Sequence, residues 1–167
     1  MTFACIDFET ANQSDASICA AGLAVFADGA LVESRHWLVR PPKGHGWFRE
    51  DFTEIHGLRW SDVKDAAEFP AVAAELLPVL TAAEFVVAHH AAFDLRKLRG
   101  TLAHFEIPCP ELRTVCTLEM SRNLWPGESH GLDDLCKKIN HHFIHHDARE
   151  DAEAAGRLYL ALTLEKP

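Results

Sequence analysis

The opening part of the chain contains three consecutive strand-like segments, and this feature constrains the fold more than any other. The run from Phe3 to Thr10 is rich in residues that favour β-structure, and 17–26 and 30–39 have the pattern of two further strands. Between these two, Ala27-Asp28-Gly29 predicts a tight turn, because Asp-Gly readily adopts the positive φ angles that hairpins need. The N-terminal part is therefore predicted to be an antiparallel meander.

The segment that follows the meander has no sustained hydrophobic period. From Pro41 to about Trp60 the sequence predicts a long loop with short helical turns. We expect Ser61-Asp62 to cap a short helix. Pro70 is expected to be the first residue of the next helix, where its missing N–H is tolerated, and that helix should end near Leu80.

The remainder of the chain alternates between helix and strand signals. The expected elements are a strand over 84–89, a helix over 92–104, a strand over 112–116, a helix from Leu118, a helix over 132–139 and a last helix from Asp147 to Leu164. This order predicts an α/β fold whose mixed central sheet, three antiparallel strands followed by parallel strands, is flanked by helices. A chain of 167 residues without an internal repeat or linker is expected to form a single domain over residues 1–167.

Composition excludes several classes of protein. The formal net charge of −9 argues against a protein that binds long duplex with its surface alone, because such binding neutralises phosphates with Lys and Arg. The N-terminus has no basic segment before an apolar run, and no uncharged stretch could span a bilayer, so we expect a cytoplasmic protein without a membrane partner. The five cysteines are widely spaced and are expected to be reduced thiols.

Asp7 and Glu9 are the first candidate functional residues. They are two positions apart on a predicted strand, so both side chains should point to the same face. Adjacent carboxylates repel each other unless a cation lies between them. The alternative is that this strand lies at a sheet edge with that face in water, which is the commoner explanation for a lone D-x-E.

Two later segments also carry acidic residues at structurally informative places. Asp94 follows an apolar strand where a loop turns into a helix, although it could simply cap that helix. Asp151 would lie in the first turns of the last helix, with His146 on the loop that enters it. Here the alternative is that Asp147 caps the helix and Asp151 favours its dipole. Together the acids form the oxygen-rich set that Mg²⁺ or Mn²⁺ prefers.

The order of these segments resembles the three exonuclease motifs of the DEDDh family, the proofreading-exonuclease branch of the ribonuclease H-like superfamily. The matching segments are DFET, AHHAAFD and HDARED, with FTEIHGLRWSDV similar to the family's substrate-contacting loop and TVCTLEMSR similar to its following strand and helix. The resemblance covers nearly the whole chain. It implies a 3′→5′ exonuclease that acts on single-stranded DNA or RNA ends and releases nucleoside 5′-monophosphates.

The resemblance also implies a role for each candidate residue. Two divalent cations, Mg²⁺ or Mn²⁺, would be bridged by Asp7. Glu9 and Asp151 would complete one metal site and Asp94 would hold the second. His146 would be the general base, since an unperturbed imidazole with a pKa of about 6.5 accepts a proton near neutrality.

The residues that the resemblance assigns to substrate binding flank these ligands. They are Phe8, Thr10, Ile55, His56 and Phe93. Apolar and aromatic side chains of this kind can stack on a terminal nucleotide without strong sequence preference. Ordinary core packing is the alternative for Phe8, Ile55 and Phe93, because apolar residues are buried more often than they bind.

Two features depart from the family pattern. His90 stands where the family usually has Asn, so the hydrogen bonding around Asp94 is expected to differ. The histidines 141, 142, 145 and 146 are crowded together, and only the spacing to Asp151 distinguishes His146, which leaves His145 as the second candidate for the base. A structural zinc site built from this cluster is disfavoured, because no closed four-ligand spacing is evident.

Four alternatives concern what the domain does and with which partner. A non-catalytic nucleic-acid-binding module should lack a ligand or the base, and none is missing. A polymerase-associated proofreading subunit is disfavoured because the chain ends at Pro167, without a tail for tethering a polymerase. DNA against RNA stays open, and so does a homodimer, to which Trp37, Trp47, Trp60 or Trp125 could contribute.

Overall fold

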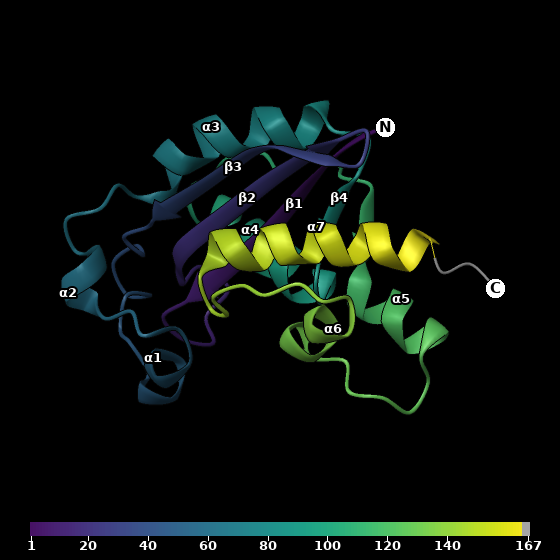
Figure 1. The fold of residues 1–167 in the computed structure, drawn as a ribbon. Coiled ribbons are helices and arrows are strands. Elements are labelled where there is room, and N and C mark those ends of the chain that lie inside the picture. Colours follow the sequence, from purple (N-terminus) through teal and green to yellow (C-terminus); the bar gives the residue numbers. More distant parts are fainter. Residues whose placement is uncertain (165–167) are drawn as a thin grey trace.

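A computed structural model describes residues 1–164 and contains a five-stranded mixed sheet (Figure 1). The strands follow the order β3-β2-β1-β4-β5 across the sheet. β1 pairs antiparallel with β2, as the sequence predicts, and it also pairs parallel with β4. The strands are β1 Thr2–Thr10, β2 Ile18–Ala27, β3 Ala30–Leu38, β4 Val86–Ala88 and β5 Thr114–Cys116. The α/β class with an antiparallel and a parallel part of the sheet is therefore confirmed.

Helices cover both faces of this sheet. In Figure 1, α3 runs along one face and α7 crosses the other, while α5 and α6 lie beside α7 and α1 and α2 lie near one end. The helices are α1 Glu50–His56, α2 Trp60–Val63, α3 Phe69–Ala82, α4 Ala91–His104, α5 Thr117–Leu124, α6 Leu132–Lys138 and α7 Ala148–Leu164. In the described part of the chain, no helix is both long and apolar enough to span a bilayer.

The starts of α2 and α3 differ by one or two residues from the prediction. α2 begins at Trp60, so Asp62 lies inside its first turn, where the side chain accepts the backbone N–H of Arg59 at 2.7 Å. α3 begins at Phe69, so Pro70 is the second helical residue rather than the first. Both positions still suit their residues, because the first-turn N–H groups of a helix lack intrahelical partners.

The alternation of side chains along β1 connects the core with the acidic residues. Ile6 and Phe8 belong to the core that α3 and α4 cover. Phe3 and Cys5 point to the other face and pack with residues of α7. Because side chains alternate along a strand, Asp7 and Glu9 continue the α7 side. The end of β1 therefore places two carboxylates where the apolar core stops.

Gly22 allows α7 to approach the sheet at this point. It is the register partner of Asp7, and a Cβ atom at this position would lie 1.8 Å from the carbonyl oxygen of Ala148. The first turn of α7 therefore lies directly on β2, beside Asp7.

We expect Gly22→Ala to destabilise the protein by roughly 1–3 kcal/mol, because the added methyl group must push the start of α7 off the sheet. Urea unfolding of the variant and the wild type measures this difference. Activity should fall as well, since the displaced turn carries Asp151. An unchanged unfolding midpoint would contradict the close packing of α7 on Gly22.

Candidate active site

The two carboxylates of β1 lie in the middle of the sheet, because β1 is placed between β2 and β4. The edge-strand explanation for this D-x-E pair is therefore wrong. Asp7 is partly buried, and the Glu9 side chain is only 13% exposed. Two acids in such surroundings need a compensating charge.

Asp94 reaches the same place from α4. The parallel pairing of β1 with β4 covers only Ala4 and Cys5, because β4 is three residues long. Farther along β1, the backbone N–H of Phe8 donates to Oδ1 of Asp94 at 3.2 Å. The N-cap of α4 is His90 and Asp94 is only 2% exposed, so Asp94 is neither the N-cap residue nor a solvated first-turn residue. The Asp94 carboxylate thus accepts a backbone N–H of β1 beyond the two residues that pair with β4.

His90 makes the turn that brings α4 into position. Its φ of 71° lies in the left-handed region, which Asn adopts more readily than most residues. Its side chain makes no capping hydrogen bond, and the ring stacks on Phe93 with centroids 6.2 Å apart.

Asp147 and Asp151 have different roles at the start of α7. Oδ1 of Asp147 accepts the backbone N–H groups of Arg149 and Glu150, both at 3.1 Å, so Asp147 caps the helix. Asp151 lies one turn later, and its side chain is 4% exposed. Carboxylate oxygens of Asp7, Glu9 and Asp151 all lie within 4.8 Å of one another.

The electrostatics of this cluster favour a cation. Burial raises the pKa of Asp7 well above its usual value, and repulsion from Asp94 and Asp151 adds to the effect. Burial, with repulsion from Asp151, raises the pKa of Glu9 to about 8. The pKa of Asp94 is also raised well above normal, chiefly by burial. All-oxygen donors that repel one another in this way suit a hard divalent cation.

The two adjacent histidines face these acids differently. Nδ1 of His145 donates to Oδ1 of Asp151 at 2.7 Å, and this hydrogen bond raises the pKa of His145. The backbone N–H of His146 donates to Oδ2 of Asp151 at 2.7 Å, while its ring Nδ1 is 3.9 Å from Oε1 of Glu9. Burial, and then the neighbouring His145, lowers the pKa of His146. The His146 ring thus makes no carboxylate hydrogen bond.

The crowded histidines do not form a four-ligand site. Within residues 1–164, the sets of three or more possible ligands in close reach are Asp7, Glu9 and Asp151, and His145, His146 and Asp151. His141 and His142 belong to neither set. The arrangement of the described residues therefore does not favour a structural zinc site.

A cleft opens beside the acids and consists of two adjoining cavities of about 260 and 270 Å³. Glu9, His145 and His146 line both of them. Phe93 lines the first cavity, together with Asp7 and Asp151. Ile55 and His56 line the second. The fold therefore brings most of the predicted site residues around one cleft.

Phe8 and Thr10 are exceptions among the predicted substrate-binding residues. Phe8 touches the cleft but is only 3% exposed, and its ring packs edge-on against Phe69 in the core. Thr10 is 2% exposed, and its carbonyl accepts Nε2–H of His56 at 3.1 Å. Burial favours core packing for the Phe8 side chain, and Thr10 holds a cleft residue in place through its backbone.

His89 is a cleft residue that sequence reasoning missed. Its Nε2–H donates to the carbonyl of His130 at 3.0 Å, and Nδ1 lies 2.9 Å from the hydroxyl of Thr117. Burial lowers the pKa of His89 to about 4, so the ring is neutral. Its place at the end of β4, directly before His90, was the available signal. His89 ties this strand end to the loop before α6 that also lines the cleft.

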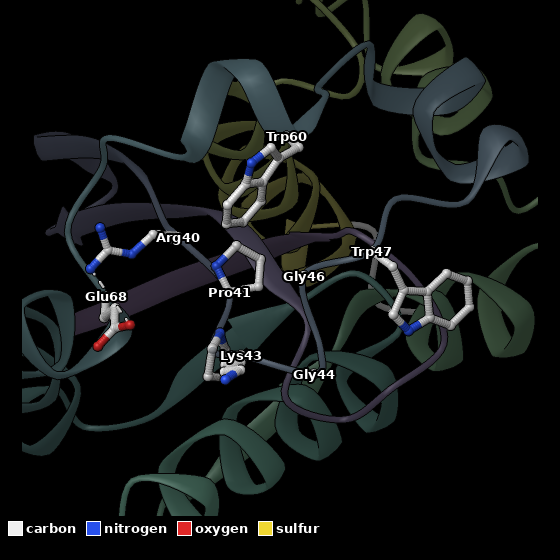
Figure 2. Close-up of a pocket in the computed structure, with 9 residues that line it drawn as sticks. Arg40, Pro41, Lys43, Gly44, Gly46, Trp47, Trp60 and Glu68 are labelled. Atoms are coloured by element: carbon white, nitrogen blue, oxygen red, sulfur yellow. Dashed lines mark ion pairs between the residues drawn. The ribbon is translucent and has the colours of Figure 1, made fainter.

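A separate hollow of about 560 Å³ lies outside the cleft (Figure 2). Trp60 stands over Pro41 and Gly46 there, and Lys43 and Trp47 lie on the same loop (Figure 2). None of the four acids lines this hollow.

The comparisons with known proteins agree with this geometry. The model of the exonuclease family RNase_T matches residues 4–159. The chain belongs to this exonuclease family. Over 117 residues it is 34% identical to DNA polymerase III subunit epsilon of Rickettsia prowazekii, a match that covers 66% of the chain and 51% of that relative. The chain thus spans about half the length of this curated relative.

Solved exonuclease structures share the fold. Exonuclease X in complex with 5′ overhanging duplex DNA has a TM-score of 0.76 and 24% identity, covering 97% of this chain and 91% of that one. The nuclease domain of 3′hExo, a DEDDh family member bound to rAMP, has a TM-score of 0.80 and 12% identity, covering 98% and 92%. The predicted ribonuclease H-like fold and the resemblance to DEDDh-type 3′→5′ exonucleases are confirmed. Membership of this family implies dependence on divalent metal ions.

Proposed function

We propose that residues 1–167 form a single exonuclease domain that hydrolyses the terminal phosphodiester bond at 3′ ends of single-stranded nucleic acid and releases nucleoside 5′-monophosphates. Residues 165–167 lie outside the described part of the chain. The observation that carries the proposal is the convergence of acids from β1, α4 and α7 beside one cleft. Carboxylate oxygens of Asp7, Glu9 and Asp151 lie within 4.8 Å of one another, and Asp94 on α4 accepts the backbone N–H of Phe8 at 3.2 Å.

Two divalent cations, Mg²⁺ or Mn²⁺, are the cofactors that this proposal requires. Asp7 would contact both cations, Glu9 and Asp151 would complete one site, and Asp94 would hold the other. Such a pair supplies a nucleophilic hydroxide and stabilises the leaving 3′ oxygen. The raised pKa values of Asp7 and Glu9 support this assignment, because bound cations would remove the repulsion behind part of these shifts.

His146 is the proposed general base. Its ring makes no hydrogen bond to a carboxylate, whereas Nδ1 of His145 is already occupied by Asp151. His146 lines both cavities, and its neutral imidazole can accept the proton of the attacking water. His145 then positions Asp151.

The terminal nucleotide is proposed to occupy the two cavities of the cleft. Phe93 would contact its base or sugar from one side, and Ile55 and His56 from the other. Ile55 is 54% exposed, as a residue that contacts a ligand from solvent can be. Phe8 and Thr10 are almost fully buried. For these two residues we therefore propose contact with the nucleotide only through the small exposed part of their surface at the end of β1.

The direct test is digestion of a 5′-labelled single-stranded oligonucleotide with Mg²⁺ or Mn²⁺. We expect a descending ladder of labelled products and a nucleoside 5′-monophosphate as the released unit. A 3′ end blocked by a phosphorothioate linkage serves as control and should slow the ladder from its first step. Absence of digestion with either metal, on both DNA and RNA, would overturn the proposal.

A second candidate is a proofreading subunit of a DNA polymerase. It is favoured by the 34% identity to DNA polymerase III subunit epsilon. Affinity purification of the protein separates the two candidates. A stable complex with a polymerase would favour the subunit, and digestion by the isolated protein without such a complex would favour a free-standing nuclease.

A further inference from the structure

Among the described residues that line the two cavities of the cleft, only histidines can carry a positive charge. In this part of the chain, neither cavity is lined by lysine or arginine. The chain as a whole carries a formal charge of −9. Single-stranded nucleic acid is nevertheless a polyanion, and its binding depends on cations that neutralise successive phosphates. Bound metal ions could serve the scissile phosphate, but the phosphates upstream of it need another partner.

Helix α4 concentrates positive charge next to the cleft. Arg96, Lys97 and Arg99 follow Asp94 within five positions. Lys97 has a fully buried side chain and donates to the carbonyls of Gln13 and Ser14 at 3.0 and 2.7 Å, so it serves the fold. The side chains that can meet a ligand are those of Arg96 and Arg99.

Arg96 and Arg99 form a track that begins at the cleft. The guanidinium of Arg96 lies over the ring of Phe93, 5.8 Å from its centroid, and Phe93 lines the cleft. Arg99 follows one helical step later, and side chains at this spacing are neighbours on a helix surface. Both arginines line a hollow of about 600 Å³ whose other lining residues are Asp15 and further residues of α4.

The guanidinium of Arg96 is exposed and can exchange its present partner for a phosphate. Arg96 contacts Asp15 at 3.4 Å, with 58% and 51% of the two side chains exposed. Exposed ion pairs of this kind contribute little to stability and are readily exchanged. Arginine binds phosphate through two parallel hydrogen bonds, which makes a phosphate a stronger partner than Asp15 at this distance.

We propose that Arg96 and Arg99 bind the phosphates immediately upstream of the terminal nucleotide, so that a single strand leaves the cleft past Phe93 along α4. This inference rests on the proposed exonuclease function and adds a path for the substrate. The hollow in Figure 2 offers a different path, over Trp60. Its Arg40 is paired with Glu68 at 3.5 Å. Among the described residues, no aromatic ring of the cleft lies against Arg40 or Lys43, whereas Phe93 lies against Arg96.

The test compares two substrates that share the same chemistry. One is a single-stranded oligonucleotide of twelve thymidines, and the other is the p-nitrophenyl ester of thymidine 5′-monophosphate, which has no upstream phosphate. The variants are Arg99→Ala and the double variant Arg96→Ala/Arg99→Ala. Arg122→Ala on α5 is the control, because it removes an exposed arginine that lines neither the cleft nor the α4 hollow.

For the double variant we expect the ratio of KM for the oligonucleotide to KM for the ester to rise about tenfold. The slope of log KM against log salt for the oligonucleotide should fall by about 0.7 for each phosphate that the variant no longer neutralises. The control should leave the ratio and the slope as in the wild type.

Two results would separate the inference from the function on which it rests. If the wild type hydrolyses neither substrate, the exonuclease proposal fails. If it hydrolyses both and the double variant keeps the wild-type ratio and salt slope, the α4 track is wrong. A raised ratio in Trp60→Ala together with an unchanged ratio in the double variant would likewise overturn it and would place the strand over the hollow in Figure 2.

Discussion

Replacement of Asp7 by asparagine is expected to lower kcat by roughly a thousandfold, which corresponds to about 4 kcal/mol of transition-state stabilisation. Asp7 is the proposed ligand of both cations, and its carboxylate lies within 4.8 Å of those of Glu9 and Asp151. Asparagine keeps the size of the side chain and removes its charge. Initial rates on the 5′-labelled oligonucleotide at saturating Mn²⁺ measure the loss.

The same variant should make the metal-free protein more stable. The pKa of Asp7 is raised in the folded protein, first by burial and then by the neighbouring acids, so folding favours the protonated carboxyl. Stability that depends on a raised pKa is present at low pH and is lost as pH rises through the folded pKa. The advantage of asparagine should therefore be larger at pH 8 than at pH 5. Urea unfolding in EDTA at both pH values tests the sign.

Asp65→Asn is the matched control for this variant. Asp65 is an exposed acid outside the cleft, with 89% of its side chain in solvent. Its replacement should change neither activity nor the dependence of stability on pH. The wild type should also gain stability on addition of Mn²⁺, and Asp7→Asn should gain much less. An active Asp7→Asn protein, or one destabilised in EDTA at pH 8, would show that the metal assignment is wrong.

The sheet was predictable because its signals are local. Asp28 and Gly29 both have positive φ, as the predicted turn requires. The alternation along β1 placed Asp7 and Glu9 on one face, and that face is fixed by Ile6 and Phe8 packing on the other. A strand pattern does not contain its own position in the sheet, so the choice between a wet edge and a central strand needed the pairing with β2 and β4.

Other parts of the site depend on contacts between distant segments. Gly22 is an ordinary strand residue in the sequence, and its role exists only because Ala148 lies against it. His89 is prominent in the sequence only as a neighbour of His90, yet its ring joins β4 to His130. Phe8 lies between two acids, and the sequence leaves both core packing and substrate contact open for its ring, which the structure places in the core.

Motif spacing favours Asp151 over Asp147 as the candidate ligand, and the structure gives the two acids different roles. Both acids lie near the start of the last helix, and either is compatible with its dipole. The structure separates them because Asp147 accepts N–H groups of α7, whereas Asp151 is buried beside the β1 carboxylates. In the same way, Nδ1 of His145 is hydrogen-bonded to Asp151, whereas the ring of His146 makes no carboxylate hydrogen bond.

His146→Gln is expected to lower kcat by about 10²- to 10⁴-fold, the usual contribution of a general base. Glutamine retains a polar side chain but cannot accept a proton near neutral pH. The Mn²⁺ concentration that gives half-maximal activity should stay close to that of the wild type, because the backbone N–H of residue 146, which donates to Asp151, is retained.

His145→Gln should give the opposite kinetic pattern. The His145 ring holds Oδ1 of Asp151 at 2.7 Å, so its loss should raise the Mn²⁺ concentration needed for activity and reduce kcat at saturating metal only modestly. The pH profile at saturating Mn²⁺ distinguishes a base from a positioning residue: the rise in kcat with pH should disappear in His146→Gln and persist in His145→Gln. If the rise disappears in His145→Gln instead, His145 is the base and His146 is not.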